Sequence, residues 1–283
     1  MTYRYKKTGF ASALALGVAM MGLAGAASAS SIHVLTSDGQ VLLAKTATGT
    51  TKLVNTIRPL AGTEDPNNPN FSPNSLGFFD GTFYATSFMN DGDEIIYSFD
   101  AGTGLGNFNV NTFAPASNGF AAGDANADGF TVVQRNGDRV DFDLNGGGGT
   151  VGGNLTGDSS TFGDIAFDTF NPGVIFASYN NVLEKFVDGA SVGLKSFFNR
   201  YVGLGFDEFG QLFGVGASGG IFALDFDNPA QTRTSTIAGF NLDGGPRLTD
   251  AASVTPVPLP AAGWLMLVGF GGLAALRRRK RAA

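Results

Sequence analysis

Oxygen-bearing side chains alternate along one short stretch of this 283-residue chain, Asp124-Ala125-Asn126-Ala127-Asp128-Gly129. Carboxylate and amide oxygens are the ligands that Ca²⁺ prefers, and a glycine at the sixth position permits the sharp turn of a cation loop. Asp124, Asn126 and Asp128 are therefore candidate calcium ligands, and calcium is the one cofactor that the sequence suggests. The alternative is a polar hairpin turn that needs no ion.

The same stretch resembles the calcium loops of EF-hand-like proteins and of FG-GAP propeller repeats. Two positions depart from those patterns, because the bidentate glutamate of an EF-hand falls on Arg135 and a later FG-GAP aspartate falls on Val132. Locally, three side chains and the Phe130 carbonyl remain. Water or another loop would have to complete a shell of six to eight oxygens.

Catalytic chemistry has little support in the sequence. His33 is the only histidine, which excludes a multi-histidine metal site and leaves one candidate base for a Ser-His-Asp arrangement. The string G-x-S-x-G occurs once, at residues 216–220, but it lies between two strand-like runs and not in the strand-to-helix turn of a nucleophile elbow. The acidic group Asp91, Asp93 and Glu94 could pair carboxylates as in a glycosidase, but "NDGDE" is typical of a polar hairpin tip. We expect no catalytic residues and no enzymatic activity.

Two glycine-rich runs, residues 102–106 and 145–154, could suggest a phosphate-binding loop. Neither carries the Lys-Ser/Thr pair of a P-loop or opens a helical pattern, so both are interpreted as connections between strands.

A repeat of about 40–45 residues supplies the elements that must position these groups. Each unit has an apolar strand that ends in Phe-Asp or a similar pair, a polar turn and further strands. Phe79, Phe167 and Phe206 occupy matching positions, 88 and 39 residues apart, and the longer gap is two steps of 44. The units start near Ile32, Leu76, Gly119, Asp164 and Leu204.

This period, with short strands and tight turns, is the signature of β-propeller blades. We predict an all-β propeller of about five blades over residues 30–254, with six blades next, and a closing strand within Gly244 to Val254. An irregular β-sandwich or solenoid is the alternative. The pairs Asp38-Gly39, Asp80-Gly81 and Asn136-Gly137 predict type I′ hairpin turns.

The two ends of the chain differ from its body. Residues 1–29 combine a basic start, an apolar run and small residues with Ala27 and Ala29 in A-x-A positions, which predicts a signal peptide cleaved after Ala29. Residues 261–276 carry no charge and would span about 24 Å as a helix, against about 30 Å of hydrocarbon. A basic cluster follows, Arg277, Arg278, Arg279, Lys280 and Arg281, and would stay in the cytoplasm.

The C-terminal end, residues 255–283, resembles a PEP-CTERM sorting tag of Gram-negative bacteria in its VPLPA-CTERM form. The motif is Val257-Pro258-Leu259-Pro260-Ala261, followed by the short transmembrane helix and the arginine cluster. The motifs that carry the resemblance begin at Val257 and cover under a tenth of the chain. The resemblance implies transient inner-membrane insertion, recognition and cleavage near the proline motif by an exosortase-type enzyme, and sorting to the cell surface or extracellular matrix beside exopolysaccharide.

Charge narrows the range of partners. All 24 acidic residues but only 10 of the 18 basic residues lie between Ser30 and Thr255, so the body carries 10 − 24 = −14. Nucleic acid and anionic lipid would be repelled by such a surface. The absence of cysteine means that no disulfide stabilises the exported body.

Together these features predict an exported, non-enzymatic interaction or structural module of the cell surface or matrix. Its partners would be signal peptidase, the sorting enzyme, and an extracellular polysaccharide or surface protein. The alternatives are a secreted propeller hydrolase or lyase acting on polysaccharide, whose carboxylates would converge at one end of the channel, and a tail-anchored protein that is never cut.

Overall fold

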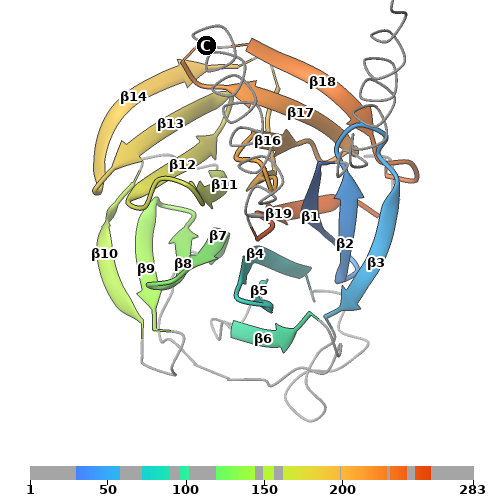
Figure 1. Cartoon of the computed structure of the whole chain (residues 1–283). Helices are drawn as coiled ribbons and strands as arrows, with labels where there is room; N and C mark the ends of the chain where they lie inside the picture. Colours follow the sequence, from blue (N-terminus) through green and yellow to red (C-terminus); the bar gives the residue numbers. More distant parts are fainter. Residues whose placement is uncertain are drawn as a thin grey trace, which may run out of the picture.

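The computed structural model describes residues 30–57, 72–88, 96–101, 119–143, 149–155, 162–197, 199–227, 230–240 and 246–255. Regular structure in these ranges consists of strands alone. No helix within them is long and apolar enough to traverse a membrane. The strands form five antiparallel sheets around a central axis (Figure 1), so the protein is a five-bladed β-propeller, as the repeat predicted. The predicted signal peptide and the sorting tag from Pro256 on lie outside the described residues.

Blades are numbered here in chain order, and each is given from its innermost strand outward. Blade 1 contains β19 (Leu248–Ala252), β1 (Ser31–Thr36), β2 (Gln40–Lys45) and β3 (Thr51–Thr56), and blade 2 contains β4 (Ser72–Phe79), β5 (Thr82–Phe88) and β6 (Ile96–Asp100). Blade 3 contains β7 (Phe120–Asn126), β8 (Gly129–Gln134), β9 (Asp138–Phe142) and β10 (Thr150–Asn154). Blade 4 contains β11 (Phe162–Phe167), β12 (Val174–Tyr179), β13 (Val182–Val187) and β14 (Ala190–Ser196), and blade 5 contains β15 (Gly203–Phe206), β16 (Leu212–Val215), β17 (Gly220–Asp225) and β18 (Ala230–Thr236).

Strand β19 closes the ring. It pairs antiparallel with β1, with His33 opposite Ala252 and Leu35 opposite Asp250. The final described strand therefore completes the first blade, which confirms the predicted closing strand. Main-chain hydrogen bonds seal the ring in place of the disulfides that the sequence lacks.

The structure also confirms the matching positions of three phenylalanines, because Phe79, Phe167 and Phe206 are each the last residue of an innermost strand. The first unit of the predicted repeat begins one strand too late in its blade. The repeat matches Ile32 with Leu76, but Ile32 lies on the second strand of blade 1 whereas Leu76 lies on the innermost strand of blade 2. The reason is that β19 supplies the innermost strand of blade 1 from the other end of the chain.

The three hairpin turns predicted from the sequence adopt two different backbone conformations. Asp80 and Gly81 both have positive φ, 45° and 78°, which confirms the type I′ turn. In the other two predicted turns only the glycines, Gly39 and Gly137, have positive φ, so the type I′ prediction is wrong there. Each of those hairpins has a three-residue connection, closed by a bond from the glycine N–H to the carbonyl three residues earlier.

The core lies between the blades. Five clusters of buried apolar side chains each join two neighbouring blades, as when Leu35 of blade 1 packs with Leu76 and Phe83 of blade 2. The alternation along β9 agrees with this packing, since Val140 and Phe142 are buried while Asp141 between them is half-buried. The many phenylalanines thus serve mainly to join blades.

Candidate binding pocket

A cavity of about 380 Å³ lies between blades 3 and 4. Its walls come from the β7–β8 turn, the neighbouring faces of β8 and β9, and two turns of blade 4. The lining residues are Asn126, Asp128, Gly129, Thr131, Arg139, Asp141, Phe167, Gly173, Ile175, Asp188 and Gly189. Phe167 and Ile175 are buried and give the cavity an apolar part, whereas the other side chains are polar or charged.

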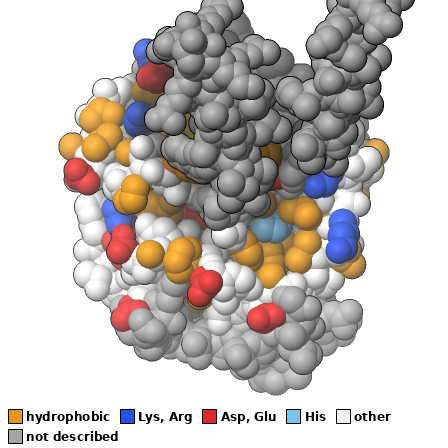
Figure 2. Space-filling model, in the orientation of Figure 1, with side chains coloured by type: hydrophobic (Ala, Val, Ile, Leu, Met, Phe, Trp, Pro, Cys, Tyr) orange, Lys and Arg blue, Asp and Glu red, His pale blue; other side chains and the backbone are white. Residues whose placement is uncertain are grey.

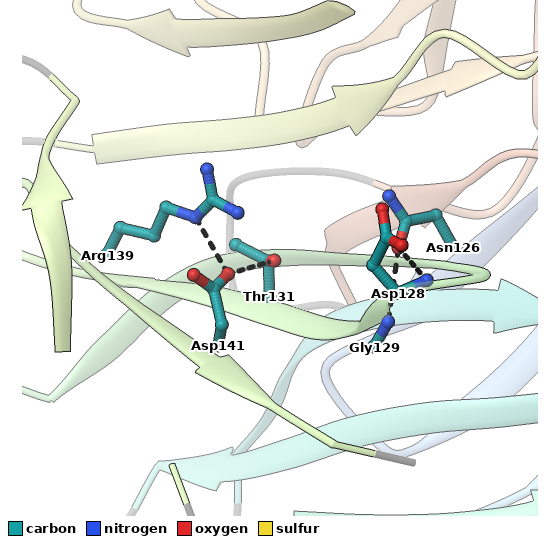
Figure 3. A network of polar contacts seen from close by, with 6 residues as sticks. All are labelled: Asn126, Asp128, Gly129, Thr131, Arg139 and Asp141. Atoms are coloured by element: carbon teal, nitrogen blue, oxygen red, sulfur yellow. Dashed lines mark hydrogen bonds and ion pairs between the residues drawn. The ribbon is translucent and has the colours of Figure 1, made fainter. Parts of the chain in front are cut away.

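Hairpin register explains how three of the polar groups meet. Thr131 on β8 lies opposite Asp141 on β9, and Arg139 shares a strand face with Asp141 because it is two residues away. The Asp141 Oδ1 atom accepts a hydrogen bond from Thr131 Oγ1 at 2.5 Å and one from Arg139 Nε at 2.7 Å. Figure 3 shows the Asp141 carboxylate between these two donors. The guanidinium is thereby held in a fixed orientation at the cavity wall.

On the blade 4 side of the cavity, Gly173 leaves space for the carboxylate of Asp188. Asp188 begins a two-residue turn with Gly189, and both have positive φ. A Cβ on Gly173, which has φ of 85°, would lie 2.5 Å from Asp188 Oδ1. Any larger residue at this position would therefore displace the Asp188 side chain from the cavity.

This lining suits a ligand rich in hydroxyl groups. Carboxylate oxygens accept hydrogen bonds from hydroxyls, a guanidinium donates them, and the apolar part can contact the carbon face of a sugar ring. The three carboxylates and one guanidinium carry a formal charge of −2, so the lining favours neutral or amine-bearing ligands over anionic ones.

The predicted calcium residues are divided between two places. Asn126 and Asp128 line the cavity, whereas Asp124 is fully buried and is not among the lining residues. Asn126 Oδ1 accepts hydrogen bonds from the N–H groups of Asp128 and Gly129, as Figure 3 shows, and this forms an Asx turn. The described residues contain no group of three acidic or histidine side chains placed to hold a metal. These contacts favour the alternative of a polar turn, and calcium binding stays a prediction.

Asp124 instead belongs to a group of three buried aspartates near the axis. Asp124 on β7, Asp164 on β11 and Asp250 on β19 are each 0% exposed. Each accepts a hydrogen bond from the next residue's own N–H, and a second one from the innermost strand of the following blade. The second donors are the N–H groups of Phe167, Leu204 and Leu76, respectively. We call this group the axial carboxyls.

The axial carboxyls interact with one another. Burial raises the pKa of Asp164 well above its ordinary value, and the charge of Asp250 and the hydrogen bond between the two carboxyls raise it further. Burial also raises the pKa of Asp250, to about 7, although the bond from Asp164 and three backbone N–H groups lower it. Both carboxyls of this pair therefore hold a proton to higher pH than an exposed aspartate does. Burial likewise raises the pKa of Asp124.

The polysaccharide hydrolase alternative required carboxylates, or His33 with a carboxylate, at one end of the channel. The carboxyls that do converge are sealed from solvent and are occupied by backbone donors. His33 packs against the rings of Phe78 and Phe83 at 4.7 Å between ring centroids, and its Nδ1 lies 3.4 Å from the Ser253 carbonyl oxygen. Burial lowers the pKa of His33 to about 4, so the ring is neutral. Asp91, Asp93 and Glu94 lie outside the described residues.

Sequence reasoning missed Thr131, Arg139, Asp141 and Asp188 as pocket residues. A usable signal existed for the first three, because period-two alternation and the three-residue turn at Gly137 fix which side chains face one another. Asp188 carried the Asp-Gly turn signature but no sign of its neighbour in blade 3. The axial carboxyls had a weaker signal, an aspartate inside an apolar strand at Asp164 and Asp250.

No protein-family model matches the chain, and no curated protein does. Solved structures resemble it in fold only. The WD40 β-propeller domain of Doa1 has a TM-score of 0.44 and 12% identity, over 77% of this chain and 88% of that one. The computationally designed Ika8 protein gives 0.40 and 15%, over 72% and 64%, and the Neurospora crassa Pan2 WD40 domain gives 0.43 and 13%, over 64% and 54%. Likenesses this distant say nothing about a ligand.

Proposed function

We propose that this protein is exported, sorted by its C-terminal tag to the cell surface or extracellular matrix, and acts there as a non-enzymatic module that binds polysaccharide. The pocket between blades 3 and 4 is the observation that carries the binding role. It places hydroxyl, carboxylate, amide and guanidinium groups around one cavity beside an apolar wall. Export and sorting rest on the end segments of the sequence.

The negative charge of the body narrows the class of ligand that we propose. The body carries −14, and acidic side chains are spread over the face drawn in Figure 2. A polymer of uronic acids would be repelled both by the body and by the pocket. The proposed ligand is therefore a neutral or amino-bearing glycan, unless a divalent cation bridges the two.

Binding should depend on the Asp141 carboxylate. Exchanging it for an amide, Asp141→Asn, removes the charge that holds Arg139 and Thr131, so we expect at least a tenfold loss of affinity for the host's own exopolysaccharide, measured by titration calorimetry. The matched control is Asp143→Asn, which makes the same charge change two residues away and outside the pocket. Equal affinity of Asp141→Asn and the wild type would refute binding at this pocket.

Repeating the titration in excess calcium and in excess EGTA tests the bridging role. If calcium bridges an acidic glycan, EGTA should abolish binding, and Asp128→Asn should weaken it. For a neutral or amino-bearing glycan, affinity should be the same in both buffers.

The sorting part is tested on the protein from its own host. The intact mass is measured in the culture medium and in the membrane fraction. A chain that ends near Pro258 to Ala261, with or without an added group, supports sorting by the tag. A chain that runs to Ala283 and occurs only in membranes would make this a tail-anchored protein and would remove the link to exopolysaccharide.

A further inference from the structure

Two nearly buried acids lie beside the residue with which the exported chain is predicted to begin. Asp207 and Glu208, in the turn between β15 and β16, are 2% and 5% exposed. Ser30 Oγ donates a hydrogen bond to Asp207 Oδ2 at 2.5 Å, and the Ser31 N–H donates one to Glu208 Oε2 at 3.0 Å. The start of β1 is thus attached to blade 5.

Other contacts fix the position of Ser30. Its carbonyl oxygen accepts bonds from both the N–H and the Oγ1 of Thr46, at 2.9 and 3.1 Å, and its Oγ accepts a further bond from Thr46 Oγ1 at 2.8 Å. Asp207 is equally constrained, since its Oδ1 accepts bonds from the N–H groups of Phe209 and Gln211. Neither side of this contact can move freely.

Covalent geometry then locates the Ser30 nitrogen. It is three bonds away from its own Oγ and three bonds away from the Ser31 nitrogen, which puts it within about 4 Å of each. Adding the two hydrogen-bond lengths places the Ser30 nitrogen within about 7 Å of a carboxylate oxygen of both Asp207 and Glu208. Before cleavage this nitrogen is a neutral amide with one N–H. After cleavage it is an ammonium with three donors and a positive charge.

We propose that Asp207 and Glu208 form a dock for the α-ammonium group that signal-peptide cleavage creates at Ser30, so that processing strengthens the blade 1–blade 5 seam. The inference rests on the export part of the proposed function and is independent of the pocket. An ammonium within about 7 Å of two carboxylates with little solvent exposure is attracted to both, which the neutral amide of an uncut chain is not. The propeller therefore reaches its full stability only once the leader has been removed.

The test uses the full-length precursor, exported and processed by its host and then purified. N-terminal sequencing establishes where the chain begins. The α-amino group is then acetylated at mildly acidic pH, where lysines are protected because their pKa is about 10.4 against about 8 for an α-amine. Melting temperatures are compared before and after acetylation in the wild type, in Asp207→Asn/Glu208→Gln, in Glu208→Gln, and in the control Asp227→Asn, which removes an exposed charge.

We expect acetylation to lower the melting temperature by roughly 4–8 °C in the wild type and in Asp227→Asn, and by much less in the double variant. If the double variant does not fold, Glu208→Gln gives the comparison, and the wild-type shift needs no variant at all. A wild-type protein that melts at the same temperature after acetylation overturns the dock. Equal losses in the wild type and the double variant overturn it as well.

The same experiment separates the two proposals. A chain that begins at Ser30 and is indifferent to acetylation sinks the dock and leaves the export proposal intact. A chain that begins elsewhere removes both the predicted cleavage and the dock.

Discussion

A chain that ends at Pro246 should fail to fold, whereas a chain that ends at Thr255 should fold normally. The shorter chain lacks β19, and with it the hydrogen-bond ladder to β1 and the buried side chains of Leu248 and Ala251. It also lacks Asp250, which binds blade 2 through the Leu76 N–H. Domains of this size are stable by only about 5–15 kcal/mol, so the loss of an innermost strand should remove cooperative folding altogether.

Thermal unfolding followed by circular dichroism, together with gel filtration, checks this result. The chain ending at Thr255 is the matched control, because it lacks the apolar tail but keeps β19. We expect a single sharp transition and a monomeric elution volume for the control, and a broad transition with aggregation for the shorter chain. Cooperative melting of both chains would mean that β1 does not need its partner.

Stability should fall as the pH rises from 6.5 to 9. A carboxyl whose folded pKa is raised holds its proton longer in the folded state than in the unfolded one. Its stabilising contribution is complete below the unfolded pKa, near 4, and is lost as the pH rises through the folded pKa. For Asp250 that pKa is about 7, and for Asp164 and Asp124 it is also shifted upward.

His33 acts in the opposite direction and at lower pH. Its folded pKa of about 4 means that its contribution is lost as the pH falls from 6.5 toward 4. At pH 6.5 the histidine is about half protonated in the unfolded state, and well above that pH it is neutral in both states. The fall in stability on the alkaline side therefore reports mainly the axial carboxyls, with the N-terminal amine as the other group that titrates there.

Urea unfolding at pH 6.5 and pH 9 measures this loss, which we expect to be about 2 kcal/mol, the equivalent of one to two pKa units in a buried pair. In Asp164→Asn the loss should shrink, because the shared proton is replaced by a fixed amide, even if the variant is less stable at pH 6.5. Asp143→Asn should keep the wild-type dependence. A wild-type midpoint that is flat from pH 6.5 to 9 would contradict the shared proton.

Much of the fold could be predicted because blades repeat. The Phe79, Phe167 and Phe206 positions indicated the period, and the stretch from Gly244 to Val254 supplied the candidate for the closing strand. The misplaced first unit shows the limit of such matching. A period in the sequence finds similar strands, but it cannot show that a blade is assembled from both ends of the chain.

The candidate site was predictable only in part. Asn126 and Asp128 do line a cavity, but Asp124 has a structural role at the axis, although its spacing in the sequence suggested a shared ligand shell. Side-chain spacing gives the face of a strand, and it does not say whether that position is close to the axis or to the rim. Asp188 and Gly173 enter the pocket from another blade, a contact set by packing around the ring.

The order of strands in blade 1 also has a mechanical consequence. After β19, Ser253 and Val254 bond to Phe206 of blade 5, and only Thr255 then precedes the predicted sorting tag. A pull on a tail held by a surface would therefore be applied close to the strand that closes the ring. Because β19 runs antiparallel to β1, a force along the strand shears the paired residues together instead of opening them one at a time. A pull along β19 would therefore be resisted by all the paired residues of the closing strand at once.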